Sequence, residues 1–589
     1  MKTLQELYIE ELALLKDSAQ VFSDDNPALT SRLVRDNIDP DVDMIMQGLA
    51  YLTAQIRREI SSEFPAALQA MSQVLTPTLM EPMPAMTVLD FTPKPGLLKP
   101  LEINAGTDAD SVSVATETTE QPIHCRFSSE WDVTVLPLSV SRVHSSLLDI
   151  GEGEHAERGL ELKIEFDSSK NDLANYEFSK LRVFLDLPSA DSASWLALLK
   201  SQLRNLVIAD SSGEFNVAQP NISLPGFSEP EREVNRDSEG DLHSLLKNYY
   251  MFIEKFLFFD VDLSAWKARS GNTFSLTFRC SQPSSVMPPL QHENIRLFAA
   301  PSRNQFDSFN VPSLLREHQT EVVLTARSRT LAGDENLEIL SVKSVEAVQG
   351  GQTQGVEYQD LLRPQKIDGS APGFTFYRKP GPQDNETVPC IGLMNNAVYP
   401  DGDTVLRVSV SCCNGASASR VGPGEVTLRT DRTPELVEVT NLTRASGFQH
   451  AAIVSERAWQ VVSDQTLSLA TVSNAEQLKR LLKHHIPVGL ETTAKQKANI
   501  HKIEAVEHLE VLASEVLFEK RFIRGNTYFL TLNSEHFNGT GDLFLFAALL
   551  EELFARQKVL NSYSQLVVLD SRTGSKTRWP IRLGSQGHA

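Results

Sequence analysis

Prolines at positions 77, 82 and 84 divide this chain into a short helical part and a much longer β-rich part. Proline lacks a backbone N–H and disfavours a helical conformation in the residue before it, so a helix does not continue through such a segment. Apolar residues recur every three or four positions before the prolines and alternate with polar residues after them. The division predicts an α+β, multi-domain fold: an N-terminal helical segment, then largely β domains, then a mixed α/β C-terminal domain.

The two N-terminal helices are expected to present wide apolar faces. A short segment that prolines separate from the β domains has few neighbours of its own, so we expect these faces to pack with helices of another subunit. The alternative, that both helices fold back onto the chain's own β domain, stays open. The predicted subunit-interface residues are Leu4, Tyr8, Leu12, Leu15, Val42, Ile45, Leu49, Leu52, Ile56 and Ile60.

The stretch DPDVD at residues 39–43 looks like the start of a calcium-binding loop. Such a loop needs Gly at its sixth position and Glu at its twelfth, and this chain has Met44 and Ala50 there. The acidic residues instead suit a helix start, with Asp39 as the cap and Pro40 in the first turn. The sequence therefore predicts the capped beginning of the second helix rather than a metal site.

Alternating patterns after the prolines predict strands, interrupted by a helix at 189–207 and by a helix that runs into a strand at 243–263. Near the C-terminus the pattern predicts helices at 474–485 and 541–558 and strands at 526–532 and 564–570. The predicted domains are a helical segment for a subunit bundle at 1–85, a β-rich domain with inserted helices at 86–290, a second β-rich domain at 291–445 and the mixed domain at 446–589.

Charge and cysteine usage narrow the class of protein. The formal net charge of −21 makes nucleic acid an unfavourable main partner, because phosphate backbones are also negative. The five cysteines show no CxxC spacing, which is typical of reduced thiols in the cytosol. No apolar run approaches the ~18 residues that span a bilayer, and the acidic N-terminus is unlike a signal peptide.

A search for catalytic motifs gives no candidate. HExxH, GxSxG and a complete phosphate-binding loop do not occur in the sequence. The adjacent His484 and His485 cannot share one helix face as metal ligands, and we expect them at the surface of a helix C-terminus. We therefore predict no catalytic residue, no cofactor and no metal ligand, and we expect that the chain is not an enzyme.

Three blocks of sequence resemble one known family in the same order. DPDVDMIMQGLAYL (39–52) with the prolines that follow, SLLKNYYMFIEKFLFFDVDL (244–263) and FNGTGDLFLFAALLEELFA (537–555) are similar to motifs of the TssF family, also called VasA or ImpG, of type VI secretion baseplate subunits. The resemblance covers nearly the full length. The chain departs from the family's pattern at Met44, Glu81, WQVVSDQTLSL (459–469) and CCNG (412–415).

The resemblance implies a structural role without a cofactor. Members of this family are wedge components of the baseplate, in which two copies join one TssG and assemble with TssK and TssE around the VgrG spike before the sheath polymerises. The implied location is the cytoplasm, in a baseplate docked at the inner face of the cytoplasmic membrane. The alternative is a cytosolic β-sandwich glycan-binding protein or hydrolase, whose candidate residues are Glu254, Asp260 and Asp262.

Overall fold

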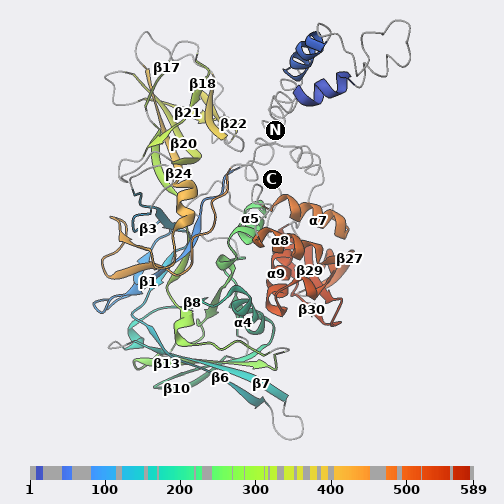
Figure 1. Ribbon diagram of the computed structural model, residues 1–589. Helices are drawn as coiled ribbons and strands as arrows, with labels where there is room; N and C mark the ends of the chain where they lie inside the picture. The colour runs from blue at the N-terminus through green and yellow to red at the C-terminus, as the bar shows by residue number, and fades with distance from the viewer. Residues whose placement is uncertain are drawn as a thin grey trace.

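The structure is a computed structural model of the 589-residue chain (Figure 1). The expected α+β, multi-domain class is confirmed, because helices precede several β-sheets and a last part mixes helices with strands. The structure describes residues 8–16, 43–55, 81–114, 122–150, 157–168, 172–217, 220–227, 242–267, 269–283, 286–310, 312–315, 319–327, 337–349, 355–362, 372–380, 387–394, 404–450, 472–486, 494–518, 521–556 and 562–583.

The two N-terminal helices cover residues 8–16 and 43–55, and in Figure 1 they lie apart from the β-rich body. The side chains of Lys16 and Asp43 form an ion pair of 3.0 Å that joins the two helices. Because residues 43–55 are helical, the stretch that follows DPDV is not a calcium-binding loop. Residues 39–42, where the cap was predicted, lie outside the described part of the chain.

A six-stranded antiparallel sheet forms the centre of the body. In strand β1 all six residues of the alternating stretch MTVLDF are buried, so both faces of this part of the strand are covered. β1 pairs with two strands that are distant in the sequence, so Met86 lies opposite Arg303 and Leu89 lies opposite Asn441. In spatial order the strands are β25 (Val426–Arg429), β3 (Asp108–Ser111), β4 (Arg126–Ser129), β15 (Ala299–Arg303), β1 (Met86–Pro93) and β26 (Val437–Asn441).

Two further antiparallel sheets lie below the central sheet in Figure 1. One apolar cluster runs from the central sheet through both of them into the C-terminal part. Their strands are, in spatial order, β10 (Gly213–Val217), β9 (Leu203–Asp210), β13 (Thr273–Ser281), β7 (Glu157–Asp167) and β6 (Ser139–Ile150) in one sheet, and β11 (Ile222–Ser223), β12 (Phe258–Asp262), β8 (Lys180–Leu185) and β14 (Ile295–Arg296) in the other.

The inserted helix is shorter than the sequence predicted. Helix α4 covers Ser189–Ser201, and β9 begins two residues later at Leu203. The stretch LRNLVIAD contains β-branched residues and pairs with β13 over most of its length, so tertiary pairing decides its conformation. The predicted helix running into a strand is confirmed, since helix α5 (Leu242–Met251) leads through a 3-10 turn into β12.

Residues 306–413 form a separate nine-stranded sheet, here called the arm, which rises above the central sheet in Figure 1. The arm has an apolar cluster of its own, so it packs largely around itself. The chain enters the arm from β15 and leaves it after β24, next to the point of entry. The strands are β16 (Phe306–Asn310), β17 (Ser313–Leu315), β18 (Glu321–Val323), β19 (Ala326–Arg327), β20 (Glu338–Gln349), β21 (Val356–Asp360), β22 (Gly373–Pro380), β23 (Thr387–Met394) and β24 (Thr404–Cys413).

The C-terminal part combines a five-stranded sheet with three helices, and the helices and strands predicted there are confirmed with small shifts of their ends. Helix α9 connects β28 to the parallel strand β29 and is buried along most of its length. The elements are α7 (Ala475–His484), α8 (Ala494–Glu504), β27 (Val506–Phe518), β28 (Arg521–Leu532), α9 (Thr540–Arg556), β29 (Ser562–Asp570), β30 (Lys576–Arg578) and β31 (Arg582–Leu583).

Smaller elements complete the described chain. Strands β2 (Leu101–Ile103) and β5 (Val133–Val135) form a two-stranded ladder. The 3-10 helices are η2 (Leu173–Asn175), η4 (Ile253–Phe256), η5 (His292–Asn294), η6 (Gly415–Arg420) and η8 (Ser534–His536). Within the described residues, no helix is long and apolar enough to cross a membrane.

Candidate functional site

The second N-terminal helix exposes apolar side chains, namely Met44, Tyr51 and a row on the side opposite Asp43. Ala50 and Ala54, which lie on the same side of this helix as Asp43, are fully buried. Ile45, Leu49 and Leu52 lie on the opposite side and are exposed by 68%, 47% and 57%. Their spacing of four and three residues places them in one row, here called the N-terminal apolar face. A helix whose apolar row faces water has a surface suited to a partner.

The other predicted interface residues divide into two groups. Tyr8, Leu12 and Leu15 are half-buried on the first helix, on the side where Lys16 reaches Asp43. The structure therefore separates the predicted residues, because those of the first helix are half-buried while those of the second helix are exposed. Leu4, Val42, Ile56 and Ile60 lie outside the described residues.

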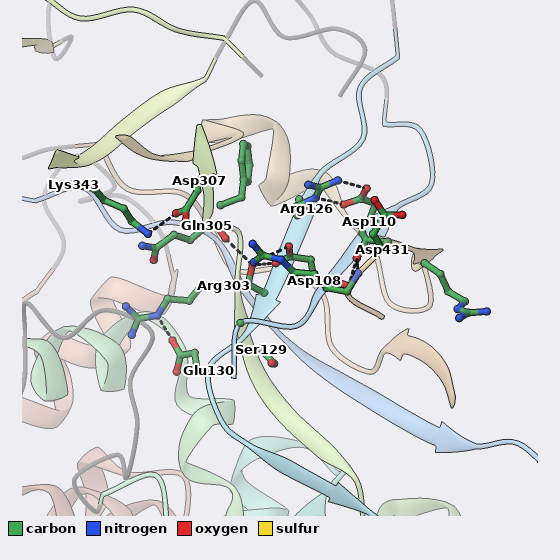
Figure 2. A pocket seen from close by; sticks show the side chains of 16 residues that line it. Asp108, Asp110, Arg126, Ser129, Glu130, Arg303, Gln305, Asp307, Lys343 and Asp431 are labelled. Carbon is green, nitrogen blue, oxygen red and sulfur yellow. Dashed lines mark hydrogen bonds and ion pairs between the residues drawn. The ribbon is translucent and has the colours of Figure 1, made fainter. Parts of the chain in front are cut away.

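A cavity of about 380 Å³ lies where the arm meets the central sheet (Figure 2). Its walls come from β3 and β4, from the crossing between β15 and β16, from β20 of the arm and from the turn after β25. Most of its lining side chains are charged, and Phe306 is its only aromatic side chain. The residues span positions 106 to 432, so no local sequence pattern could have predicted this cavity.

Two ion pairs lie on the cavity wall. Arg126 donates from Nε and Nη2 to the two carboxylate oxygens of Asp110, at 2.7 and 2.9 Å. Lys343 pairs with Asp307 at 2.6 Å within the arm. Figure 2 shows both pairs on the cavity wall. Such matched pairs stabilise the wall and hold the arginine and lysine side chains in place.

Asp108 is a buried acid of the cavity wall. It accepts a hydrogen bond from the Ser128 hydroxyl, and Arg432 approaches its other oxygen at 3.6 Å. Burial raises the pKa of Asp108, and the contacts with Ser128 and the nearby arginines only partly offset this effect.

A buried ion cluster forms part of the cavity wall. Glu130 pairs with Arg303 and with Lys255, whose Nζ is 2.6 Å from Oε2 of Glu130. Burial alone would raise the pKa of Glu130, but Arg303 and Lys255 outweigh it, so the pKa of this carboxyl is lowered. Lys255 belongs to the EKFLFF stretch between α5 and β12, so the cluster ties that segment to the central sheet.

Of the three acids proposed for a hydrolase, Asp260 and Asp262 have structural contacts, whereas Oε2 of Glu254 is buried without a hydrogen-bond partner among the described residues. Asp260 is buried and pairs with Lys180 at 2.5 Å and with Arg182 at 2.8 Å. Asp262 accepts a hydrogen bond from the backbone N–H of Ser264. The Ser264 side chain, together with this backbone contact, lowers the pKa of Asp262. Among the described residues, no group of three or more His, Cys, Asp and Glu side chains is arranged to hold a metal ion.

All five cysteines are buried free thiols. Cys412 packs in the apolar cluster of the arm, and Cys413 packs with Leu340 and Phe448. The two neighbours therefore point to opposite sides of β24, as strand geometry requires. Burial raises the pKa of Cys413 to about 12, which keeps this thiol protonated at neutral pH.

His485 is not at the surface, which corrects the prediction for this residue. It caps the C-terminus of α7, but it is buried and stacks on His243 of α5. Because the Leu481 carbonyl can only accept, Nδ1 of His485 donates to it at 2.7 Å. Nε2 then accepts from Nδ1–H of His243 at 2.6 Å. The neighbouring Leu482 and Ile486 are buried too, so α7 turns this end toward α5.

Comparison with known proteins identifies the family. The family model described as "Type VI secretion system, TssF" matches residues 1–586. The type VI secretion system component TssF1 of Pseudomonas aeruginosa strain PAO1 is 22% identical over 643 aligned positions, which cover 99% of this chain and 99% of that protein. Both matches extend over nearly the whole chain.

Two solved structures share the fold. A chain of the type VI secretion TssK-TssF-TssG baseplate subcomplex matches with a TM-score of 0.75 and 20% identity, covering 93% of this chain and 99% of that one. A chain of a type VI baseplate complex matches with a TM-score of 0.61 and 15% identity over 100% of both chains. With the family model matching along almost all of its length, the chain belongs to the type VI secretion system TssF family.

Proposed function

We propose that the chain is a structural wedge subunit of a type VI secretion baseplate. In this role it assembles with TssG, TssK and TssE around the VgrG spike and helps to dock and trigger the contractile sheath. Membership of the TssF family supports the proposal, as does the shared fold with a chain of a TssK-TssF-TssG baseplate subcomplex. The assembly would lie in the cytoplasm at the inner face of the membrane, and the role would be structural rather than catalytic.

The observation that carries the proposal is the N-terminal apolar face. Exposed apolar area is unfavourable by roughly 25 cal/mol per Å², so three exposed aliphatic side chains in one row favour association. The face lies on a short helix pair apart from the body, where a partner's helices can reach it (Figure 1). We infer that helices of TssG cover it, with two copies of this chain on each TssG.

Substitution of Leu49 tests this assignment. Leu49→Asp places a charge in the middle of the face, and because Leu49 is exposed the isolated chain should stay folded. We expect TssG to co-purify with the wild-type chain and not with Leu49→Asp. Tyr51→Asp is the matched control, because Tyr51 is also exposed on this helix but lies outside the row. Retention of TssG by Leu49→Asp at the wild-type level would contradict the assignment.

A further inference from the structure

Strand β27 is a long edge strand of the C-terminal sheet. It has 13 residues, whereas strands in globular proteins typically have about five or six. It pairs with β28 along one side, and among the described residues no strand pairs with its other side. Natural proteins usually shorten or cover such edges, because the free N–H and C=O groups can pair with another chain.

Only the first part of β27 is packed against the body. Val506 and Leu509 are buried, close to helices α7 and α8. From Glu510 onward the side chains whose burial is described are exposed or half-exposed. The outer half of the strand thus extends beyond the helices that cover its beginning, and Figure 1 shows β27 at the outer side of the C-terminal part.

The tip of the β27–β28 hairpin carries exposed apolar side chains. Leu517 and Phe522 lie opposite each other and are exposed by 61% and 78%. They are on the same face of the hairpin as Tyr528, which stacks on Phe554 near the end of α9 with ring centroids 4.1 Å apart. Helix α9 therefore covers this face of the hairpin near Tyr528. Beyond the end of α9, toward the tip, the described residues leave the same face exposed.

The charge of β27 indicates what kind of strand could pair with it. The strand contains three glutamates, at positions 507, 510 and 515, and it contains no lysine or arginine. Glu515 pairs with Arg524 of β28 at 2.7 Å. Residues 510–518 of a second copy contain no lysine or arginine that could lie beside Glu510. A basic strand would be favoured.

We propose that β27 is a docking edge for an extended segment of a different baseplate subunit. The segment would add as a further strand beside residues 510–518, with a basic residue next to Glu510 and apolar residues over Leu517 and Phe522. Backbone hydrogen bonds would supply affinity and the side chains specificity, as in other cases of strand addition. The proposal rests on the proposed function, because it takes the partner from the same assembly.

Hydrogen exchange tests the docking edge directly. In the isolated full chain, amides of residues 510–517 that point away from β28 should exchange rapidly, since no described strand pairs with them. In a complex reconstituted with TssG and TssK, the same amides should become protected. Slow exchange in the isolated chain would overturn the proposal, because the edge would then already be paired. Unchanged rapid exchange in the complex would overturn it as well.

Two substitutions measure the contribution of the edge. Glu510→Lys and Phe522→Ser should each weaken binding of the TssG–TssK complex by about tenfold, as truncation of interface anchors does. The matched controls are Glu214→Lys and Phe215→Ser, because both residues are exposed on β10, which is also an edge strand. The controls should stay within about twofold of wild type. If the substitutions on β10 weaken binding as much as those on the β27–β28 hairpin, the proposal that β27 is a specific docking edge is contradicted.

The outcomes separate this proposal from the proposed function. If Leu49→Asp abolishes binding while β27 stays unprotected in the wild-type complex, the docking edge is wrong and the baseplate role remains. If the isolated chain dimerises and Phe522→Ser prevents this, the occupant is a second copy and the docking edge for another subunit is wrong. If the wild-type chain forms no complex with TssG and TssK, both proposals are contradicted.

Discussion

Asn304 and Asn414 exchange two hydrogen bonds at the base of the arm. Nδ2 of Asn304 donates to Oδ1 of Asn414, and the backbone N–H of Asn414 donates to Oδ1 of Asn304, each at 2.7 Å. Both residues are buried. They sit where the chain enters and leaves the arm, so this pair joins the two crossings to each other. Nδ2 of Asn304 also donates to the Arg126 carbonyl at 2.8 Å, which ties the pair to the central sheet.

Asn304→Ala should destabilise the arm–body junction. The substitution leaves the N–H of Asn414 buried without this acceptor, which typically costs about 1–3 kcal/mol. The measurement is the free energy of unfolding in urea for the transition that includes the body. Asn216→Ala, at an exposed position of β10, is the control and should change the value by less than about 0.5 kcal/mol. An equal, small effect of both substitutions would show that the pair contributes little.

Glu130→Gln should destabilise the body strongly. The substitution removes the negative charge that compensates Arg303 and Lys255 in a buried cluster, and breaking such a cluster costs about 3–5 kcal/mol. Urea unfolding measures the loss, and Glu214→Gln on the exposed edge strand β10 is the control. The lowered pKa of Glu130 also predicts that its stabilising effect is present at neutral pH and is lost as the pH falls through its folded-state pKa.

The buried histidine pair predicts a second acid-sensitive contact. Burial, together with the nearby His243, His484 and Lys247, holds the pKa of His485 well below its ordinary value of 6.5. Between the folded-state and unfolded-state pKa values the unfolded chain binds more protons, so the free energy of unfolding falls as the pH falls below 6.5. His485→Gln should reduce the difference in melting temperature between about pH 7.5 and about pH 5.5.

The control for the histidine pair is His144→Gln, at an exposed position of strand β6. This variant should keep the wild-type difference in melting temperature between the two pH values. If His485→Gln shows the same difference as the wild-type chain, the contact between α5 and α7 does not respond to acid as the geometry implies.

Gly541 lies at a close contact between helices α9 and α4. A Cβ at this position would lie 2.2 Å from the backbone nitrogen of Ser194, closer than atoms can approach. Gly541→Ala should therefore force the helices apart and destabilise the chain by about 1–3 kcal/mol, measured by urea unfolding. Gly447→Ala is the control, since a Cβ there would meet no atom within 4 Å. An unchanged free energy of unfolding for Gly541→Ala would contradict the close packing of α4 on α9.

Local patterns predicted the elements better than their arrangement. The alternation of MTVLDF was sufficient to predict strand β1, and the apolar run of residues 541–558 was sufficient to predict helix α9. Both patterns reflect the burial of the element itself. The pairing of β1 with β15 and β26 joins residues more than 200 positions apart, and no local pattern encodes it. For the same reason the cavity and the Asn304–Asn414 pair could not be predicted.

Only part of the arrangement of the N-terminal helices could be predicted from the sequence. Helical spacing correctly placed Ile45, Leu49 and Leu52 on one side of their helix, because the angle between residues is fixed. It could not decide that this side would be exposed while Tyr8 and Leu12 would be half-buried, since that depends on how the two helices meet. The surface position predicted for His485 was wrong. That His484 and His485 are adjacent excludes a shared metal site on one helix face, but it does not show whether a residue of another helix covers His485.

The mass of the complex with TssG tests the central claim most directly. Light scattering coupled to size-exclusion chromatography would measure the mass of the full chain mixed with TssG. Our account predicts one species whose mass equals two copies of this chain and one TssG, which Leu49→Asp converts to separate components and Tyr51→Asp leaves intact. Elution of the wild-type chain and TssG as two separate species would contradict the account.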